Sequence, residues 1–302
     1  MSMKQTDTVT LKRWPGDAKV AVVFQFVFEL WEGTHVEPGR HTAPQLPLSA
    51  IKSGMRDLVS LSWQDYAGRA GFYRLMDTAL AEGVTATGLF NGCAVQKYPD
   101  IAREFARAGN ELAAHSWSED VKSYLLSNDD LRADVTRTKK IIQDVAAYDP
   151  VGWSSSGQQG GPNTLDVVAA EGFKYVVERV DDDCPVFFDA GGRTLVGFSP
   201  SFDINDHQLH ARGLNGPDAY IETFRRQISV LLEEDQDGQL PFVVNAVFHA
   251  TLFGHPLGGW ALRECIRLAK GIPGVWVTTN RACAEHCLAK FAPAGGGAAM
   301  TS

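Results

Sequence analysis

Segments of strand character alternate with segments of helical character along most of this 302-residue chain, and this alternation constrains its fold more than any other feature. Residues 20–28 (VAVVFQFVF) form a β-branched and aromatic run that is typical of a buried strand. Residues 71–82 then place apolar side chains at helical spacing. Repeated alternation of this kind predicts an α/β fold of parallel strands covered by helices, as a barrel or an open sheet.

The remaining elements are expected at regular intervals along one domain covering residues 14–291. Asn128 or Asp129 is expected to cap the longest helix. Residues 32–60 lack periodicity and are expected to form a long loop, while the termini, 1–13 and 292–302, are expected to be flexible. Further strands are expected at 84–90, 111–114, 175–177, 194–198, 242–248 and 275–278, and further helices at 101–108, 128–147, 164–171, 216–234 and 261–269.

The composition restricts the class of partner. A formal charge of −8 leaves no broad basic face, which argues against nucleic acid. The apolar runs are too short for a membrane helix, and the first 14 residues lack the apolar core of a signal peptide, so we expect a cytoplasmic protein without a membrane partner. Five widely spaced cysteines indicate reduced thiols, and Cys283 and Cys287 are expected to be buried on a helix rather than to bind zinc.

Acidic and histidine side chains follow four of the expected strands. Glu29, His115 and His249 each come at a strand end, and Glu119 follows His115 by four residues. Asp181, Asp182 and Asp183 follow a fourth strand. Each residue alone has an ordinary explanation, as a solvated carboxylate or a hydrogen-bonded histidine. Because the carboxyl ends of parallel strands share one rim, their convergence predicts a metal site or an acid–base pair there.

The order of motifs resembles the polysaccharide-deacetylase-like (NodB-homology) superfamily, and more closely its branch of allantoinases, cyclic-imide hydrolases and related deacetylases. The resemblance runs from Trp14 to Trp276. It is carried by WPGDAKVAVVFQFVFELWEG (14–33), DYAGRAGFYRL (65–75), FNGCAVQKYPDIAREFARAGNELAAHSW (90–117), VGWSSSGQQGGPNTLDVVAAEGFKY (151–175), DDDCP (181–185), SPSFDINDH (199–207), FHATLFGHP (248–256) and GVW (274–276).

This resemblance implies a distorted (β/α)7 barrel, a homo-oligomer (dimer or tetramer) and hydrolysis of a C–N amide bond. Metal-dependent members use an Asp base two residues before an Asp ligand, and two histidines spaced HxxxH. Here the base position is Val27, the first ligand position is Glu29 and the second histidine position is Glu119. The arginine expected after GW is absent as well. Glu29, His115 and Glu119 still form a ligand set for zinc or manganese, so metal-bound and metal-free sites remain open.

We therefore hypothesise a hydrolase that opens a small cyclic amide, ureide or imide, with no cofactor beyond such an ion. The alternatives are a metal-dependent deacetylase of an N-acetyl amino sugar, a lyase or C–C hydrolase, and an inactive relative that binds a ligand. The expected catalytic residues are Glu29, His115, Glu119 and His249, and the expected residues for binding a small-molecule substrate are Trp117, Trp153, Asp182, Asp183 and Asn205.

Overall fold

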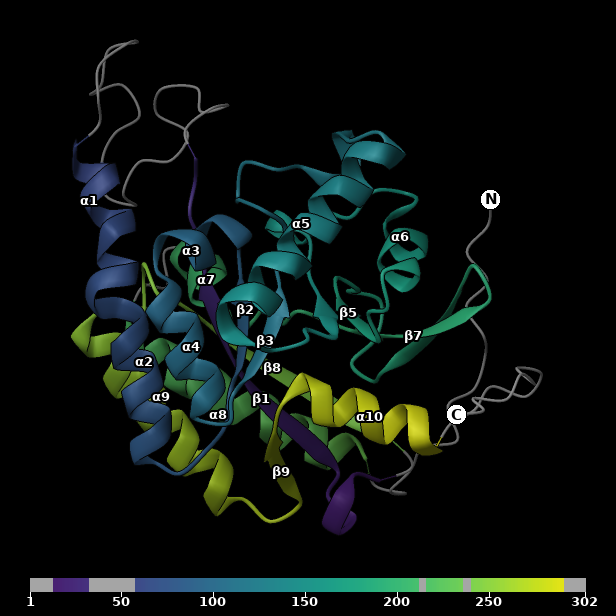
Figure 1. Cartoon of the computed structure of the whole chain (residues 1–302). Helices are drawn as coiled ribbons and strands as arrows, with labels where there is room; N and C mark the ends of the chain where they lie inside the picture. The colour runs from purple at the N-terminus through teal and green to yellow at the C-terminus, as the bar shows by residue number, and fades with distance from the viewer. Residues whose placement is uncertain (1–12, 33–57, 212–215, 236–239, 291–302) are drawn as a thin grey trace.

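The computed structural model describes residues 13–32, 58–211, 216–235 and 240–290. Their strands form one curled sheet with the order β6-β7-β5-β4-β3-β2-β1-β8, in which β9 also pairs with β1 (Figure 1). Every pairing is parallel except the hairpin of β6 and β7. The strands are β1 (Val20–Phe28), β2 (Thr87–Phe90), β3 (Glu111–Ala114), β4 (Gly152–Trp153), β5 (Tyr175–Val177), β6 (Val186–Ala190), β7 (Arg193–Phe198), β8 (Phe242–His249) and β9 (Val275–Thr278).

Helices connect the parallel strands and cover the outer face of the sheet, with α2, α4 and α9 side by side along it (Figure 1). The α-helices are α1 (Leu58–Tyr66), α2 (Phe72–Ala81), α3 (Gly92–Lys97), α4 (Pro99–Arg107), α5 (Asn128–Ala146), α6 (Thr164–Ala170), α7 (Asp206–Ala211), α8 (Pro217–Glu234), α9 (Pro256–Gly271) and α10 (Asn280–Lys290). Short helices lie at η1 (Pro15–Asp17), η4 (Ser123–Leu125) and η5 (Ser156–Gln158), and the π-helical turn η3 (Ala67–Gly71) joins α1 to α2.

Strand β1 is buried on both faces, as its apolar run predicted. Phe24, Phe26 and other side chains on one face pack against the covering helices. Val23 and Val27 on the other face pack inside the curl of the sheet, together with Cys283 of α10. Helix α10 therefore fills the inside of the curl, which explains why its cysteines are buried.

The free edge of β8 is covered by irregular chain rather than by another strand. The Val243 amide donates to the Asp183 carbonyl, and the Val247 amide donates to the Ile204 carbonyl, at 3.0 and 2.9 Å. These bonds complete the curl only in part, so the architecture is a half-barrel. They also place the segment that contains Asp183 beside the start of β8.

The predicted α/β architecture is confirmed, with several local differences. The sequence did not predict β4 or β6, because one is two residues long and the other belongs to the antiparallel hairpin. Ser127, rather than Asn128 or Asp129, caps α5, because its non-helical backbone lets its hydroxyl accept from the Asp130 amide. The last residues of the expected loop, 58–60, instead begin α1. Some of the other expectations concern segments outside the described residues, namely the loop residues 33–57 and the expected flexible segments 1–12 and 292–302.

The structure bears on the expectations about a membrane helix and about the cysteines. No helix within the described ranges is long and apolar enough to cross a membrane. All five cysteines lie in the described part and none is paired, and Cys283 and Cys287 are buried on α10 as expected.

Candidate active site

Three of the predicted catalytic residues come from the carboxyl ends of neighbouring strands. Glu29 directly follows β1, His115 directly follows β3, and His249 is the last residue of β8. Because β8 pairs with β1 in parallel register, with Val27 opposite His249, Glu29 lies two residues beyond that pair. The sheet therefore brings residues 220 positions apart in the chain to one rim.

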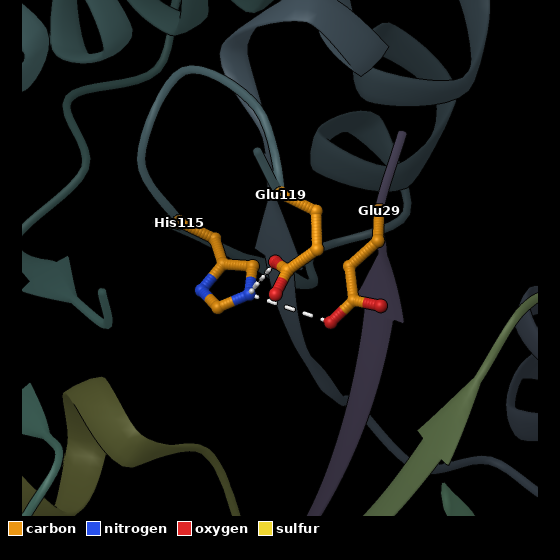
Figure 2. Close-up of side chains that lie close together, drawn as sticks. All are labelled: Glu29, His115 and Glu119. Atoms are coloured by element: carbon orange, nitrogen blue, oxygen red, sulfur yellow. Dashed lines mark ion pairs between the residues drawn. The ribbon is translucent and has the colours of Figure 1, made fainter. Parts of the chain in front are cut away.

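Glu29, His115 and Glu119 converge on one point in the structure (Figure 2). Nε2 of His115 lies 3.5 Å from Oε1 of Glu29 and 3.4 Å from Oε2 of Glu119. Oε1 of Glu29 also lies 3.5 Å from Nε2 of His249. Glu29 is thus placed between two imidazoles, and all four side chains are largely buried.

Asp206 completes this cluster, and the sequence did not single it out. Its Oδ1 lies 2.5 Å from Nδ1 of His249, and its Oδ2 accepts hydrogen bonds from the His249 and Phe253 amides at 2.8 and 3.2 Å. The Asp206 side chain is fully buried. A carboxylate on Nδ1 fixes the imidazole so that Nε2 faces Glu29. Asp206 lies in the SPSFDINDH motif (199–207), but it is 43 residues from His249 in the chain, so only the fold reveals that the two are paired.

The charges in the cluster support one another. Burial alone would raise the pKa of Glu29, but His249 and His115 outweigh that effect and hold it well below its usual range. Burial opposes the charged form of His115, yet the nearby carboxylates of Glu119 and Glu29 raise its pKa to about 10. Against the same cost of burial, Asp206 and Glu29 raise the pKa of His249 well above its ordinary value. At neutral pH the metal-free cluster therefore holds an ionised Glu29 between two protonated imidazoles.

The same residues fit a divalent metal ion. Nδ1 of His115 lies 2.9 Å from the Ser154 carbonyl, which can only accept, so Nδ1 carries a proton and Nε2 points at the carboxylates. Among the described residues, neither Nε2 of His115 nor Oε2 of Glu119 has a hydrogen-bond partner. Ligand atoms of Glu29, His115 and Glu119 all lie within 4.8 Å of one another. One imidazole and two carboxylates are suitable ligands for zinc or manganese.

Helix α5 packs against the loop that carries His115 and Glu119 and bonds its backbone. Oδ1 of Asp134 accepts from the Trp117 amide at 3.0 Å. Ser116 has a φ of +48°, a left-handed conformation that non-glycine residues adopt at a cost. Burial raises the pKa of Asp134 to about 6, although the Trp117 amide and other groups lower it. The loop therefore keeps its shape through buried contacts rather than through local preference.

The two tryptophans predicted to bind substrate lie in the core instead. Trp117 is 4% exposed, and its ring is covered by the guanidinium of Arg137 at 3.2 Å. Trp153 is fully buried, and its indole nitrogen donates to Ser155. Neither is among the described residues that line the cavity above the cluster. Their proximity to the motifs in the sequence reflects packing beneath the site.

Asp182 and Asp183 are not brought to the cavity either. They are exposed, and the Asp183 carbonyl bonds the Val243 amide near the start of β8. Six residues of extended strand separate Val243 from His249, a distance of about 20 Å. The chain after β5 thus turns back toward the opposite end of the sheet, which a position after a strand did not reveal.

A cavity of about 470 Å³ lies above the cluster. The four predicted catalytic residues and Asn205 all line it. Trp31 and Trp63, stacked at 5.9 Å, form one wall, and Val27 contributes to the apolar surface. The other lining residues are Leu89, Lys122, Gly157, Gln158, His207, Gln208, His210 and Thr251.

Residues 52–176 match the family described as "Polysaccharide deacetylase". A similar curated protein is a Schizosaccharomyces pombe protein described as "Putative polysaccharide deacetylase". It is 23% identical over 309 residues, which cover 92% of each chain. The matched family segment contains His115 and Glu119 but not Glu29 or His249.

Solved structures with the same fold cover nearly the whole chain. A Pseudomonas aeruginosa structure described as "probable Polysaccharide deacetylase" is 25% identical, covers 91% of this chain and 93% of its own, and has a TM-score of 0.79. A structure described as "Puue Allantoinase" is 24% identical with a TM-score of 0.79, covering 93% of this chain and 95% of its own. The predicted NodB-type barrel is therefore confirmed.

Proposed function

We propose that this chain is a member of the polysaccharide deacetylase family, hydrolases of carbon–nitrogen bonds other than peptide bonds, and that it opens a small cyclic amide, ureide or imide. The observation that carries this proposal is the row of side chains Asp206, His249, Glu29 and His115, with consecutive separations of 2.5, 3.5 and 3.5 Å, beneath a cavity of about 470 Å³. The row supplies a carboxylate base beside a protonated imidazole, and the cavity has the size of a small-molecule site.

The proposed reaction begins with water beside Glu29. Its carboxylate takes a proton from the water as the water oxygen bonds to the carbonyl carbon of the substrate. His249 then donates its Nε2 proton to the ring nitrogen, and the C–N bond breaks. The proton on Glu29 returns to Nε2 of His249, because Oε1 and Nε2 are 3.5 Å apart. The product is a carboxylic acid with a freed amide or amine nitrogen.

Glu29 rather than Glu119 is the proposed base, because its Oε1 lies 3.5 Å from Nε2 of His249 and can pass on to that imidazole the proton it takes from water. In a metal-free site, the protonated Nε2 of His115 would donate a hydrogen bond to the oxygen that gains charge. A divalent ion held by Glu29, His115 and Glu119 would polarise the carbonyl and lower the pKa of bound water. Asp206 acts on the reaction through His249 by holding its ring in place.

The shape of the cavity favours a flat, small substrate. Trp31 and Trp63 present an aromatic wall, against which a planar ring would stack. Asn205 lies at the edge, where its side chain already accepts from the His207 amide. Val27 occupies the position where metal-dependent relatives have an acidic base, so a carboxylate from elsewhere in the cluster must serve.

A panel of hydantoins, dihydropyrimidines, succinimides and acyclic amides tests the proposal. Wild-type protein should open at least one ring class, and Glu29→Gln should abolish that activity while leaving the melting temperature within a few degrees. Leu80→Gln, on the exposed face of α2, is a matched control that should keep full activity. A panel without turnover by folded wild-type protein would instead favour an inactive relative that binds a ligand.

A metal-dependent deacetylase of N-acetyl amino sugars is the second candidate. It is favoured by the unpartnered His115 Nε2 and Glu119 Oε2 atoms, which face each other as ligand atoms do. Elemental analysis of untagged protein and assays on N-acetylglucosamine oligomers with and without a chelator test it. If the protein holds about one equivalent of zinc or manganese and loses deacetylation on chelation, deacetylation rather than ring opening is its function.

We also propose a homo-oligomer, a dimer or tetramer, that acts on a small molecule in the cytoplasm. Light scattering coupled to size-exclusion chromatography tests the assembly, and a monomer at micromolar concentration would contradict it. Cell fractionation tests the location.

A further inference from the structure

A second cavity, of about 850 Å³, lies next to the catalytic cavity. Trp63, His210 and Thr251 line both cavities, so these residues form the border between the two. Most of the other lining side chains of the second cavity are apolar or aromatic. They include Val59, Tyr66, Leu252, Phe253, His255 and Leu257.

Trp63 stands between the two cavities in a fixed orientation. Its indole nitrogen donates to the Thr251 carbonyl at 2.8 Å. In the catalytic cavity its ring lies against Trp31, with the two ring planes inclined by 27°. A substrate ring that stacks on this wall would thus carry its substituents past Trp63 toward the second cavity.

One wall of the second cavity is flat and aromatic. Tyr66 and His255 stack with ring centroids 4.0 Å apart and planes inclined by only 5°. Arg74 holds this pair by donating to the Tyr66 hydroxyl at 2.6 Å and to the Gly254 carbonyl. A wall that is already ordered costs a ligand little conformational entropy on binding.

Two aliphatic side chains on the edge of this cavity face water. Leu257 is 66% exposed and Val59 is 51% exposed. Covering such apolar surface is favourable. A flat wall with an aliphatic edge suits an aromatic ring better than a charged or sugar-like group.

We propose that this second cavity is a subsite for an aromatic substituent on the ring that the catalytic cluster opens. The inference rests on the proposed function, since it assigns a substrate class to the same site. It makes the preferred substrate an aryl-substituted cyclic ureide or imide rather than a bare polar ring. The polar ring stays with Glu29 and His249, and the aromatic group reaches the wall of Tyr66 and His255.

Two probes, 5-methylhydantoin and 5-benzylhydantoin, test this inference. For wild-type protein, kcat/KM should be about tenfold higher for the benzyl compound, as burial of a phenyl ring predicts. Calorimetric titration of both compounds into the Glu29→Gln protein should show a similar difference in Kd without turnover. Equal affinity for the two compounds would overturn the subsite.

Variants at the edge of the cavity locate the effect. Leu257→Gln should reduce the benzyl preference severalfold and leave 5-methylhydantoin unchanged, and Leu257→Trp should block the benzyl compound by filling the cavity. Leu80→Gln, an exposed leucine of similar accessibility outside both cavities, is the matched control. A benzyl preference that survives both Leu257 variants would also overturn the assignment.

The two proposals fail separately. If the benzyl compound binds about tenfold more tightly but neither compound is hydrolysed, and the wider ring panel gives no turnover, the subsite stands and ring opening is wrong. If both compounds are hydrolysed at equal kcat/KM and bind equally, ring opening stands and the subsite is wrong.

Discussion

The inside of the curled sheet holds buried carboxylates at both ends, and they differ in how completely their oxygens are bonded. Toward the amino ends of the strands, Oε1 of Glu111 accepts from the Tyr175 hydroxyl at 2.5 Å, and its Oε2 accepts from the Thr87 hydroxyl and the Arg281 amide, each at 2.8 Å. At the carboxyl ends, His115 and Glu119 each keep a buried polar atom with no hydrogen-bond partner in the described structure.

The carboxylates at the two ends also differ in the direction in which their pKa is shifted. Burial raises the pKa of Glu111, despite its hydrogen bonds. The pKa of Glu29 is lowered in spite of burial, because two imidazoles flank it. A carboxylate whose two oxygens are bonded to neutral groups stabilises the fold, whereas unpaired atoms beside paired charges in a cavity indicate a candidate reactive site. Burial alone would not have distinguished them.

Removing the proton donor of the carboxyl-end cluster should have the largest effect. His249→Asn keeps an N–H near Asp206 but cannot donate a proton to the leaving nitrogen, so kcat should fall about 1,000-fold. Steady-state kinetics on the best ring substrate measures the change, and thermal unfolding checks that the protein remains folded. Activity within tenfold of wild type would remove His249 from the reaction.

Asp206→Asn should have the next largest effect, about 100-fold in kcat at neutral pH. Without this carboxylate the raised pKa of His249 falls, and the acid form is lost as the pH rises. The activity of the variant relative to wild type should therefore decline with increasing pH and partly recover in mildly acidic buffer. A loss of constant size at every pH would assign Asp206 a purely structural role.

Glu111→Gln should change stability and leave catalysis nearly intact. The amide keeps only one of the two acceptor oxygens, so its NH2 group meets either the Arg281 N–H or the Tyr175 hydroxyl that donated to the carboxylate, at a cost of about 1–2 kcal/mol in unfolding free energy. Because the folded-state pKa of Glu111 is raised, wild-type stability should decline as the pH rises above the ordinary value of 4.5, and the variant should lack this decline. Chemical denaturation across pH measures both, while kcat/KM should stay within about twofold of wild type. A loss of activity as large as in Asp206→Asn would contradict the division between the two ends of the sheet.

The smallest effects should come from relieving left-handed backbone strain. Ala147 ends α5 with a φ of +51°, so Ala147→Gly should stabilise the protein by about 1 kcal/mol or less without changing activity. Ser116→Gly relieves similar strain but removes the hydroxyl that accepts from the Ser156 amide. It should bring no net stability and lower kcat by less than about tenfold. Equal gains in both variants would show that Ser116 does not hold the catalytic loop.

The residues at the strand ends were predictable because a buried strand is marked by a short run of apolar residues in the local sequence. The run 20–28 and the short strand before His115 matched the structure in both boundaries, so Glu29 and His115 were correctly placed at strand ends. Trp117 was not predictable in the same way: an indole beside a motif suits either a cavity or a core. Its burial depends on Arg137 and on Gly92, where any side chain would collide with the Trp117 ring.

The sequence by itself determined the alternation of elements and the ends of the central strands, because burial pattern and hydrogen-bonding preference act within a few residues. Only the tertiary structure decided that Asp206 bonds His249, that Asp183 lies at the other end of β8, and that Trp63 separates two cavities. Such contacts join segments tens or hundreds of residues apart, and their partners are set by strand register and by the path of the connections, which leave no periodic trace in the chain.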